Sequence, residues 1–183
     1  MRGHLEVICG PMYAGKSEEL IRRLRRFEIA NEEFTVIGPD IDDRYGEGFI
    51  TSHVGNSFKC LVVPTKGEAI EIPTDILAID EAQFFESRWL VGSVQEAIEE
   101  GMTVIAAGLD LDFKRNPFGP MPALLSMAKE VIKLRAVCQV CGADAMYTQR
   151  LVEGKPASLS GEIVVVGGQE QYEARCENCW EAG

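Results

Sequence analysis

The stretch at residues 10–17 reads Gly10, Pro11, Met12, Tyr13, Ala14, Gly15, Lys16 and Ser17, which is the phosphate-loop pattern G-x-x-x-x-G-K-[ST]. The apolar run 5–9 before it predicts a buried strand, and apolar residues at intervals of three and four over 17–30 predict a helix after it. In this context, backbone N–H groups and the positive end of the helix surround an anion. Lys16 would reach the β- and γ-phosphates of ATP, and Ser17 would hold Mg²⁺. An ordinary strand-to-helix turn is the alternative interpretation.

The rest of the first 137 residues continues the alternation of strands and helices. Short apolar runs predict strands at 34–38, 61–63, 76–79, 103–107 and 131–134, and an apolar helical face predicts a helix that stops at Gly101. The polar segment 39–56 predicts one long loop, and the arginines of the first helix predict a solvated face. Strands that alternate with helices indicate an α/β fold of the phosphate-loop NTPase class, a parallel sheet flanked by helices.

Two acidic residues, Asp80 and Glu81, follow the apolar run 76–79. An acid at the end of a buried parallel strand lies beside the phosphate loop in such folds, where it binds Mg²⁺ directly or through water. Asp80 fits that role, which leaves Glu81 to accept the proton of an attacking hydroxyl. A supporting position near magnesium is the alternative for Glu81. Because no N-K-x-D guanine-reading element is present, a small phosphotransferase is favoured over a GTPase.

Four of the six cysteines form two Cys-x-x-Cys pairs, Cys138 with Cys141 and Cys176 with Cys179. Four thiolates predict a closed tetrahedral zinc site, which is structural because no position is left open for chemistry. A redox dithiol is the alternative. The composition changes at the first pair, so we expect an ATP-binding domain over 1–137 and a small zinc-binding domain over 138–183. The metal would clamp both ends of the loop that runs from Gly142 to Arg175 in the second domain.

The composition excludes several classes of protein. With 46% apolar and 26% charged residues among 183, the protein is predicted to be globular. A net charge of −11 opposes non-specific binding to nucleic acid, because the phosphate backbone would be repelled. No apolar run approaches the roughly 20 residues that cross a bilayer, so no membrane partner is expected. The first residues lack the apolar stretch of a signal peptide, so we expect a cytoplasmic protein with reduced cysteines.

Taken together, the motifs resemble those of the type II thymidine kinases, the cellular and bacterial zinc-containing family. The matching stretches are GPMYAGKS (10–17), DDRY (42–45), DEAQFF (80–85), GLDLDFKRNPFG (108–119), the first cysteine pair, MYTQR (146–150) and VVVGGQEQYEARCENC (164–179). The resemblance implies transfer of the γ-phosphoryl group of ATP, with Mg²⁺, to the 5′-hydroxyl of thymidine to give dTMP for nucleotide salvage. It also implies that the clamped loop of the zinc-binding domain is a lasso loop that covers the nucleoside. The resemblance further implies a homotetramer that is inhibited by dTTP.

The resemblance assigns a role to each matching position. Glu81 corresponds to the general base. The residues that correspond to the ATP and magnesium site, besides the phosphate loop, are Asp80, Gln83 and the lid residues Asp42 and Arg44. The residues that correspond to the nucleoside pocket are Met12, Phe84, Phe113, Thr148, Tyr172 and the base-reading backbone of Ile163, Val164, Val165, Val166 and Gly167.

The sequence departs from the family pattern in places, and other functions stay open. Asp43 replaces a small hydroxyl residue, Leu111 and Asp112 replace a smaller pair, and segment 152–162 is longer than in the animal enzymes. A kinase for another nucleoside is one alternative. A zinc-ribbon ATPase that binds nucleic acid is a second, although the net charge opposes it and Lys155 is the sole basic residue in 151–172.

Overall fold

The structure is a computed structural model that describes residues 3–41, 48–51, 57–67, 72–163 and 171–183. Its main feature is a six-stranded sheet in the order β5-β2-β6-β7-β1-β8, with every pairing parallel. The strands are β1 (His4–Cys9), β2 (Thr35–Pro39), β5 (Leu61–Val63), β6 (Ile76–Ile79), β7 (Thr103–Gly108) and β8 (Glu130–Lys133). The helices of the described residues are α1 (Lys16–Ile29), α2 (Ser87–Glu99), α3 (Met121–Met127) and the 3₁₀ turn η2 (Ala82–Phe84). The predicted α/β class is confirmed.

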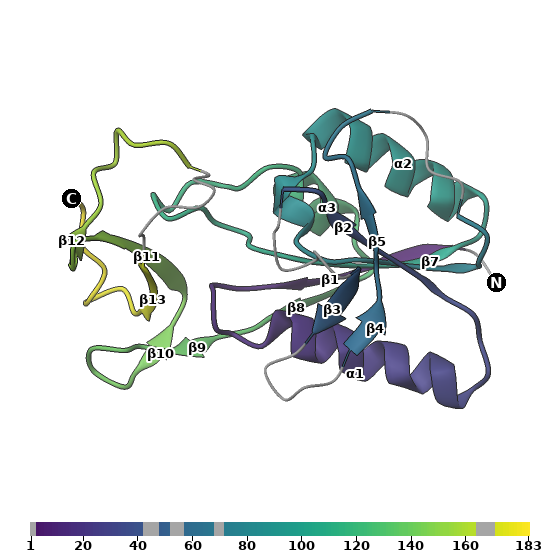
Figure 1. The fold of residues 1–183 in the computed structure, drawn as a ribbon, viewed down its shortest axis with the longest axis horizontal. Coiled ribbons are helices and arrows are strands. Elements are labelled where there is room, and N and C mark those ends of the chain that lie inside the picture. Colours follow the sequence, from purple (N-terminus) through teal and green to yellow (C-terminus); the bar gives the residue numbers. More distant parts are fainter. Residues whose placement is uncertain (1–2, 42–47, 52–56, 68–71, 164–170) are drawn as a thin grey trace.

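Helices cover both faces of the sheet, which is why its central strands are apolar almost throughout. Figure 1 shows α1 below the sheet and α2 and α3 above it. Side chains alternate along each strand. Leu5 of β1 therefore shares a core cluster with Leu90 of α2, whereas Ile8 of β1 shares one with Leu20 of α1. Burial on both faces fixes the strands and so fixes the loops at their ends.

A hairpin occupies part of the segment predicted as one long loop. β3 (Phe49–Thr51) pairs antiparallel with β4 (Ser57–Lys59). Ile50 is only 1% exposed and joins the core cluster on the α1 side of the sheet. Strands of three residues are too short to show an alternating pattern in polar surroundings. The prediction of a loop over 39–56 is therefore wrong at residues 49–51.

Two further features differ from the sequence-based expectations. α3 has only seven residues, so its apolar positions repeat over too few turns to predict a helix. Arg23 was expected on a solvated face, but its side chain is only 12% exposed and pairs with Glu6, Glu19 and Glu130. It therefore links α1 to β1 and β8, while the other arginines of that face are exposed as expected.

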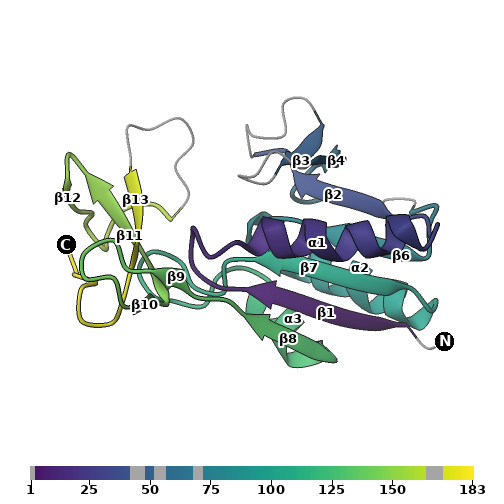
Figure 2. The same ribbon diagram turned by 90° about the horizontal axis from the view of Figure 1, so that it is seen from below.

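The C-terminal part of the protein is built from short antiparallel strands. β9 (Ala136–Val137) pairs with β10 (Asp144–Ala145), and β11 (Tyr147–Val152) lies between β12 (Lys155–Pro156) and β13 (Gln171–Arg175). Figure 2 places this part beyond the carboxyl ends of the parallel strands. That edge, where open α/β sheets bind their ligands, therefore faces the C-terminal part. None of the described helices combines the length and apolar character needed to span a membrane.

Candidate active site

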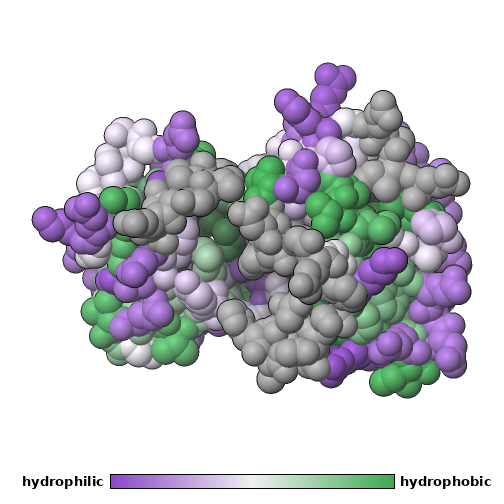
Figure 3. All heavy atoms as spheres, viewed as in Figure 1, coloured by the Kyte–Doolittle hydropathy of each residue, from purple (hydrophilic) through white to green (hydrophobic). Residues whose placement is uncertain are grey.

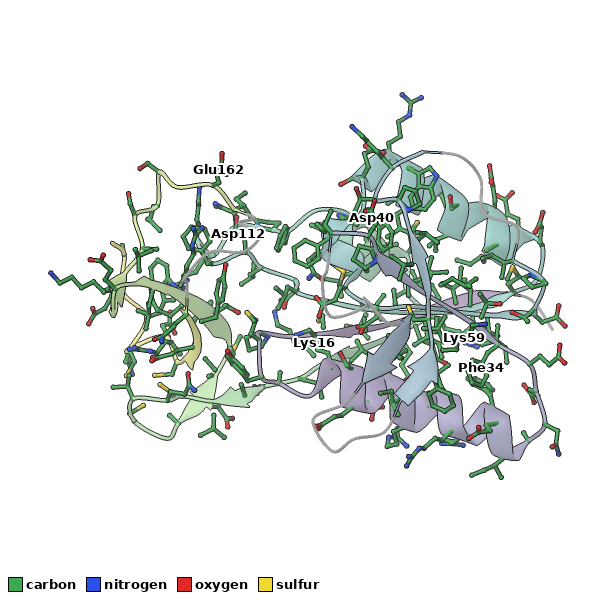
Figure 4. The ribbon with its side chains drawn as sticks, in the orientation of Figure 1. Lys16, Phe34, Asp40, Lys59, Asp112 and Glu162 are labelled. Atoms are coloured by element: carbon green, nitrogen blue, oxygen red, sulfur yellow. The ribbon has the colours of Figure 1, made fainter. Side chains whose placement is uncertain are left out.

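The phosphate loop leaves β1 at Gly10 and enters α1 at Lys16. Gly10, Tyr13 and Gly15 have φ values of 143°, 65° and 83°, and such turns form concave anion-binding nests of backbone N–H groups. A Cβ on Gly10 would lie 2.5 Å from the carbonyl oxygen of Leu134, so only glycine fits there. Lys16 is 9% exposed, and its Nζ donates to the carbonyl oxygen of Pro11 at 2.8 Å. Figure 4 shows Lys16 on the side of the sheet that faces the C-terminal part.

Asp80 reaches the phosphate loop from the carboxyl end of β6. The hydroxyl of Ser17 lies 3.3 Å and 3.4 Å from the two carboxylate oxygens of Asp80, which is a buried residue. One of these oxygens also accepts the backbone N–H of Glu81 at 3.0 Å. Hydroxyl and carboxylate oxygens are the ligands that Mg²⁺ prefers. The donor set at this point therefore fits a magnesium ion beside a bound phosphate.

Glu81 occupies a strained backbone position directly before η2. Its φ of 49° is left-handed, which is uncommon for a residue other than glycine and is typical of functional sites. Its Oε2 accepts from Nε2 of Gln83 at 2.5 Å, and Oε1 of Gln83 accepts from the backbone N–H of Leu109 at 2.9 Å. Because Gln83 is only 2% exposed, these bonds join the Glu81 carboxylate firmly to the loop after β7.

That loop, residues 109–119, forms an ordered turn. Oδ1 of Asp112 accepts the backbone N–H groups of Lys114 at 2.8 Å and Asn116 at 2.9 Å, and the loop closes with an antiparallel bridge between residues 111 and 117. Phe113 lies within this turn and is 4% exposed. The departure from the family pattern at Asp112 therefore has a structural role, because its carboxylate shapes the turn that carries Phe113.

The predicted nucleoside residues come from both parts of the molecule. The backbone N–H of Met12, in the phosphate loop, donates to Oγ1 of Thr148 on β11 at 3.0 Å. Thr148 is buried, and Tyr172 lies on β13, the neighbouring strand. Phe84 packs edge-to-face against Phe118 with 5.8 Å between ring centroids. A furrow separates the two parts on the face drawn in Figure 3.

Several predicted site residues lie outside the described part of the protein. They are the lid residues Asp42 and Arg44 and the base-reading residues Val164, Val165, Val166 and Gly167. Ile163 is described and is 42% exposed. The contacts of the phosphate loop, the acidic pair and the aromatic residues therefore define the described site.

The predicted metal ligands also come together. The Sγ atoms of the four cysteines all lie within 4.8 Å of one another, and those of Cys141 and Cys176 are 3.6 Å apart. Each pair sits on a turn, closed by N–H bonds from Gly142 to Cys138 at 2.9 Å and from Trp180 to Cys176 at 3.0 Å. Four converging thiols are the donor set of a structural zinc ion. This cluster therefore fits zinc and would clamp segment 142–175 at both ends.

The thiols of this cluster differ in their tendency to ionise. Although burial opposes ionisation, backbone N–H donors at Cys176, Cys141 and Val140 lower the pKa of the Cys138 thiol to about 6. Bonds to the Cys176 and Cys141 side chains raise the pKa of Cys179 to about 12. Because zinc binds the thiolate form of cysteine, a bound cation would favour ionisation of all four thiols. By contrast, burial and the nearby Asp110 raise the pKa of the Cys9 thiol to about 11, as expected for an inert core residue.

A comparison with known protein families decides between the possible functions. A family model described as thymidine kinase matches residues 3–180, which is nearly the whole sequence. The chain belongs to the thymidine kinase family. Its activity is therefore the phosphorylation of thymidine, and the predicted resemblance is confirmed. The matched range includes both the phosphate loop and the cysteine cluster, so both are parts of one kinase.

Two glycines at the thymidine kinase site and two arginines at the junction of the two parts were not singled out by the sequence analysis. A Cβ on Gly108 would lie 2.7 Å from Oε1 of Gln83, and a Cβ on Gly119 would lie 2.3 Å from the backbone carbonyl oxygen of Gln83. Both glycines therefore make room for Gln83. Arg115 and Arg150 stack on aromatic rings between the two parts of the molecule. The only sequence signal for these four residues is their place in the GLDLDFKRNPFG and MYTQR stretches.

Proposed function

We propose that the protein transfers the γ-phosphoryl group of ATP to the 5′-hydroxyl of thymidine, giving ADP and dTMP. The observation that best supports this reaction is the meeting of Ser17, Asp80 and Glu81 beside the phosphate loop. The homotetramer, the inhibition by dTTP, the cytoplasmic location and the domain boundary at residue 137 belong to the same proposal and rest on the resemblance and the sequence.

Glu81 is proposed as the general base. Its carboxylate accepts the proton of the 5′-hydroxyl while that oxygen bonds to the γ-phosphorus and the bond from phosphorus to the ADP oxygen breaks. The N–H donated by Gln83 fixes the direction of the carboxylate, and correct orientation of reacting groups is worth several kcal/mol of barrier. These contacts support a positioning role for Gln83 rather than the direct contact with magnesium or phosphate that the resemblance implies.

ATP is proposed to bind at the phosphate loop. Lys16 would stabilise negative charge on the transferred group, and Ser17 and Asp80 would hold Mg²⁺. Bound magnesium would supply neutralisation of charge on the phosphates. Asp42 and Arg44 are proposed as the lid over the phosphates on the basis of the resemblance.

Thymidine is proposed to bind between the two parts of the molecule. Phe84 and Phe113 would pack on the base, with Met12, Thr148 and Tyr172 near its methyl group. The hydrogen bond between Met12 and Thr148 supports this location, because it joins the phosphate loop to β11. The backbone of 163–167 would read the edge of the base. Backbone carbonyl and N–H groups suit the N3–H donor and O4 acceptor of thymine, whereas cytosine presents the opposite polarity.

Comparison of nucleosides tests this function. We expect kcat/KM for thymidine to exceed that for deoxycytidine by about 10⁴–10⁵-fold, because cytosine leaves buried polar groups unpaired. Deoxyuridine is the control, since it keeps the base edge and lacks only the methyl group; its kcat/KM should fall by about 10–200-fold. A coupled ADP-formation assay measures all three. If deoxycytidine came within tenfold of thymidine, backbone reading would be wrong, and if no natural nucleoside stimulated ATP consumption, the proposed function would be wrong.

Zinc should be found in the purified protein at about one ion per protomer, as expected for four thiolate ligands. Cys176→Ser should lower the zinc content and the melting temperature and raise KM for thymidine, because one end of the clamped segment is released. Cys60→Ser is the control. Cys60 is also buried but lies outside the cluster, so the zinc content of this variant should equal that of wild type. Elemental analysis and thermal unfolding provide the measurements. Fully active wild-type protein that contains no metal would contradict the proposed zinc clamp.

A further inference from the structure

Arg150 lies at the junction of the two parts of the molecule. It belongs to β11 and is only 5% exposed. Its guanidinium carbon is 5.0 Å from the ring centroid of Phe113, which comes from the loop after β7. A planar guanidinium stacks on an aromatic face and keeps its N–H groups available at the edge, whereas a lysine ammonium does not. Arg150 therefore fixes one face of an aromatic ring that belongs to the α/β part.

The same residue also holds the backbone near the proposed base-reading segment. Nη1 of Arg150 donates to the carbonyl oxygen of Glu162 at 2.5 Å, and Glu162 directly precedes Ile163. Figure 4 shows Glu162 on the C-terminal part and Asp112, next to Phe113, on the side that faces it. In the β11–β13 pairing, Arg150 stands opposite Tyr172. One buried residue is thus in contact with, or paired to, three segments that border the proposed nucleoside pocket.

We propose that Arg150 is a positioning residue for nucleoside binding. It sets the ring of Phe113 and the backbone at Glu162 in one fixed relation, so that these two borders of the pocket are aligned before thymidine arrives. This inference rests on the proposed function, because it takes Phe113 and the backbone at Glu162 and Ile163 as borders of the nucleoside pocket. Pre-alignment lowers the entropic cost of ordering the pocket when thymidine binds. Loss of the Arg150 contacts should therefore raise KM for thymidine more than it lowers kcat.

Arg115 provides a matched control. It is a second arginine at the same junction, with its guanidinium carbon 4.0 Å from the ring centroid of Tyr147 and 5.1 Å from that of Trp180. It also donates to the hydroxyl of Tyr147 at 3.0 Å. These contacts join the loop after β7 to β11 and to Trp180 beside the cysteine cluster. None of them involves Glu162. A purely structural role for arginines at this junction would make the two residues equivalent.

The test compares Arg150→Met, Arg150→Lys and Arg115→Met in the full-length protein. We expect Arg150→Met to raise KM for thymidine by about 10–100-fold, with kcat and KM for ATP changed less than about threefold. Arg150→Lys should give an intermediate KM, because it keeps the charge and loses the planar stack, and Arg115→Met should stay within about threefold of wild type. Thymidine dissociation constants from calorimetry provide a readout independent of turnover, and melting temperatures and zinc content report on folding.

Several outcomes would overturn the role of Arg150. These are an unchanged KM for thymidine, a fall in kcat alone, or an equal effect of Arg115→Met. If Arg150→Met does not fold, Arg150→Lys decides: a KM equal to that of wild type would show that the planar contact is not needed. An inactive wild-type protein would overturn the proposed function, whereas an active wild type with unaffected Arg150 variants would overturn only this inference.

Discussion

Glu81→Gln should lower kcat for thymidine phosphorylation by about 10²–10⁴-fold, because glutamine keeps the shape of the side chain and loses its affinity for a proton. The side-chain oxygen of glutamine can still accept the N–H of Gln83, so the backbone and the surrounding turn should be preserved. Binding of ATP should change little, since the phosphate loop is untouched. Steady-state kinetics with saturating thymidine, together with a direct titration of ATP, measure both quantities.

Glu86→Gln is the matched control for that substitution. Glu86 is exposed and accepts the backbone N–H groups of Trp89 at 2.7 Å and Arg88 at 3.1 Å, which cap α2. These bonds lower the pKa of Glu86, so the control removes the same charge at a site five residues further along the sequence. Its kcat should be unchanged. A Glu81→Gln variant that kept more than a third of wild-type activity would show that another group accepts the proton.

Lys16→Ala should lower kcat by about 10³-fold, because the ammonium group stabilises charge that develops on the transferred phosphoryl group in a site that excludes water. The substitution also removes the hydrogen bond to the carbonyl oxygen of Pro11, which lies at the other end of the loop. We therefore expect weaker ATP binding together with the loss of turnover. Stopped-time assays of dTMP formation at saturating ATP separate the two effects.

Lys129→Ala provides the comparison for Lys16→Ala. Lys129 is exposed and directly precedes β8, at the end of the sheet remote from the phosphate loop, so its loss should leave both kcat and the affinity for ATP unchanged. If Lys16→Ala phosphorylated thymidine at the wild-type rate, the assignment of residues 10–17 as the ATP site would have to be abandoned.

The sheet could be predicted because its strands carry local signals. The runs 61–63 and 76–79 are short and apolar and end at a proline and an aspartate respectively, and the structure has strands with the same limits. β3 and α3 carry no comparable signal. The apolar run at β3 is only two residues long, and α3 is too short for helical periodicity. What fixes both elements is burial against the rest of the fold, which a local pattern does not record.

The site was predictable to the extent that sheet topology determines it. Asp80 directly follows a central strand, so its nearness to Ser17 follows from the parallel order of the strands. The bond between Gln83 and Leu109 joins residues 26 apart, and the bond between Met12 and Thr148 spans 136 residues. Such contacts depend on how the loops pack, and no spacing in the sequence encodes them. The role of Gln83 toward Glu81 therefore emerged only from the three-dimensional arrangement.

The contact between Met12 and Thr148 has a consequence for the order in which the protein folds during synthesis. β1 lies between β7 and β8, so the sheet is complete only once residue 133 has left the ribosomal tunnel. The hydroxyl that receives the Met12 N–H arrives later, and the second cysteine pair later still. The ribosome adds roughly 5–20 residues per second, and N-terminal domains generally fold before C-terminal ones. During synthesis, the phosphate loop therefore emerges long before its partner Thr148, which arrives only after the last strand of the sheet.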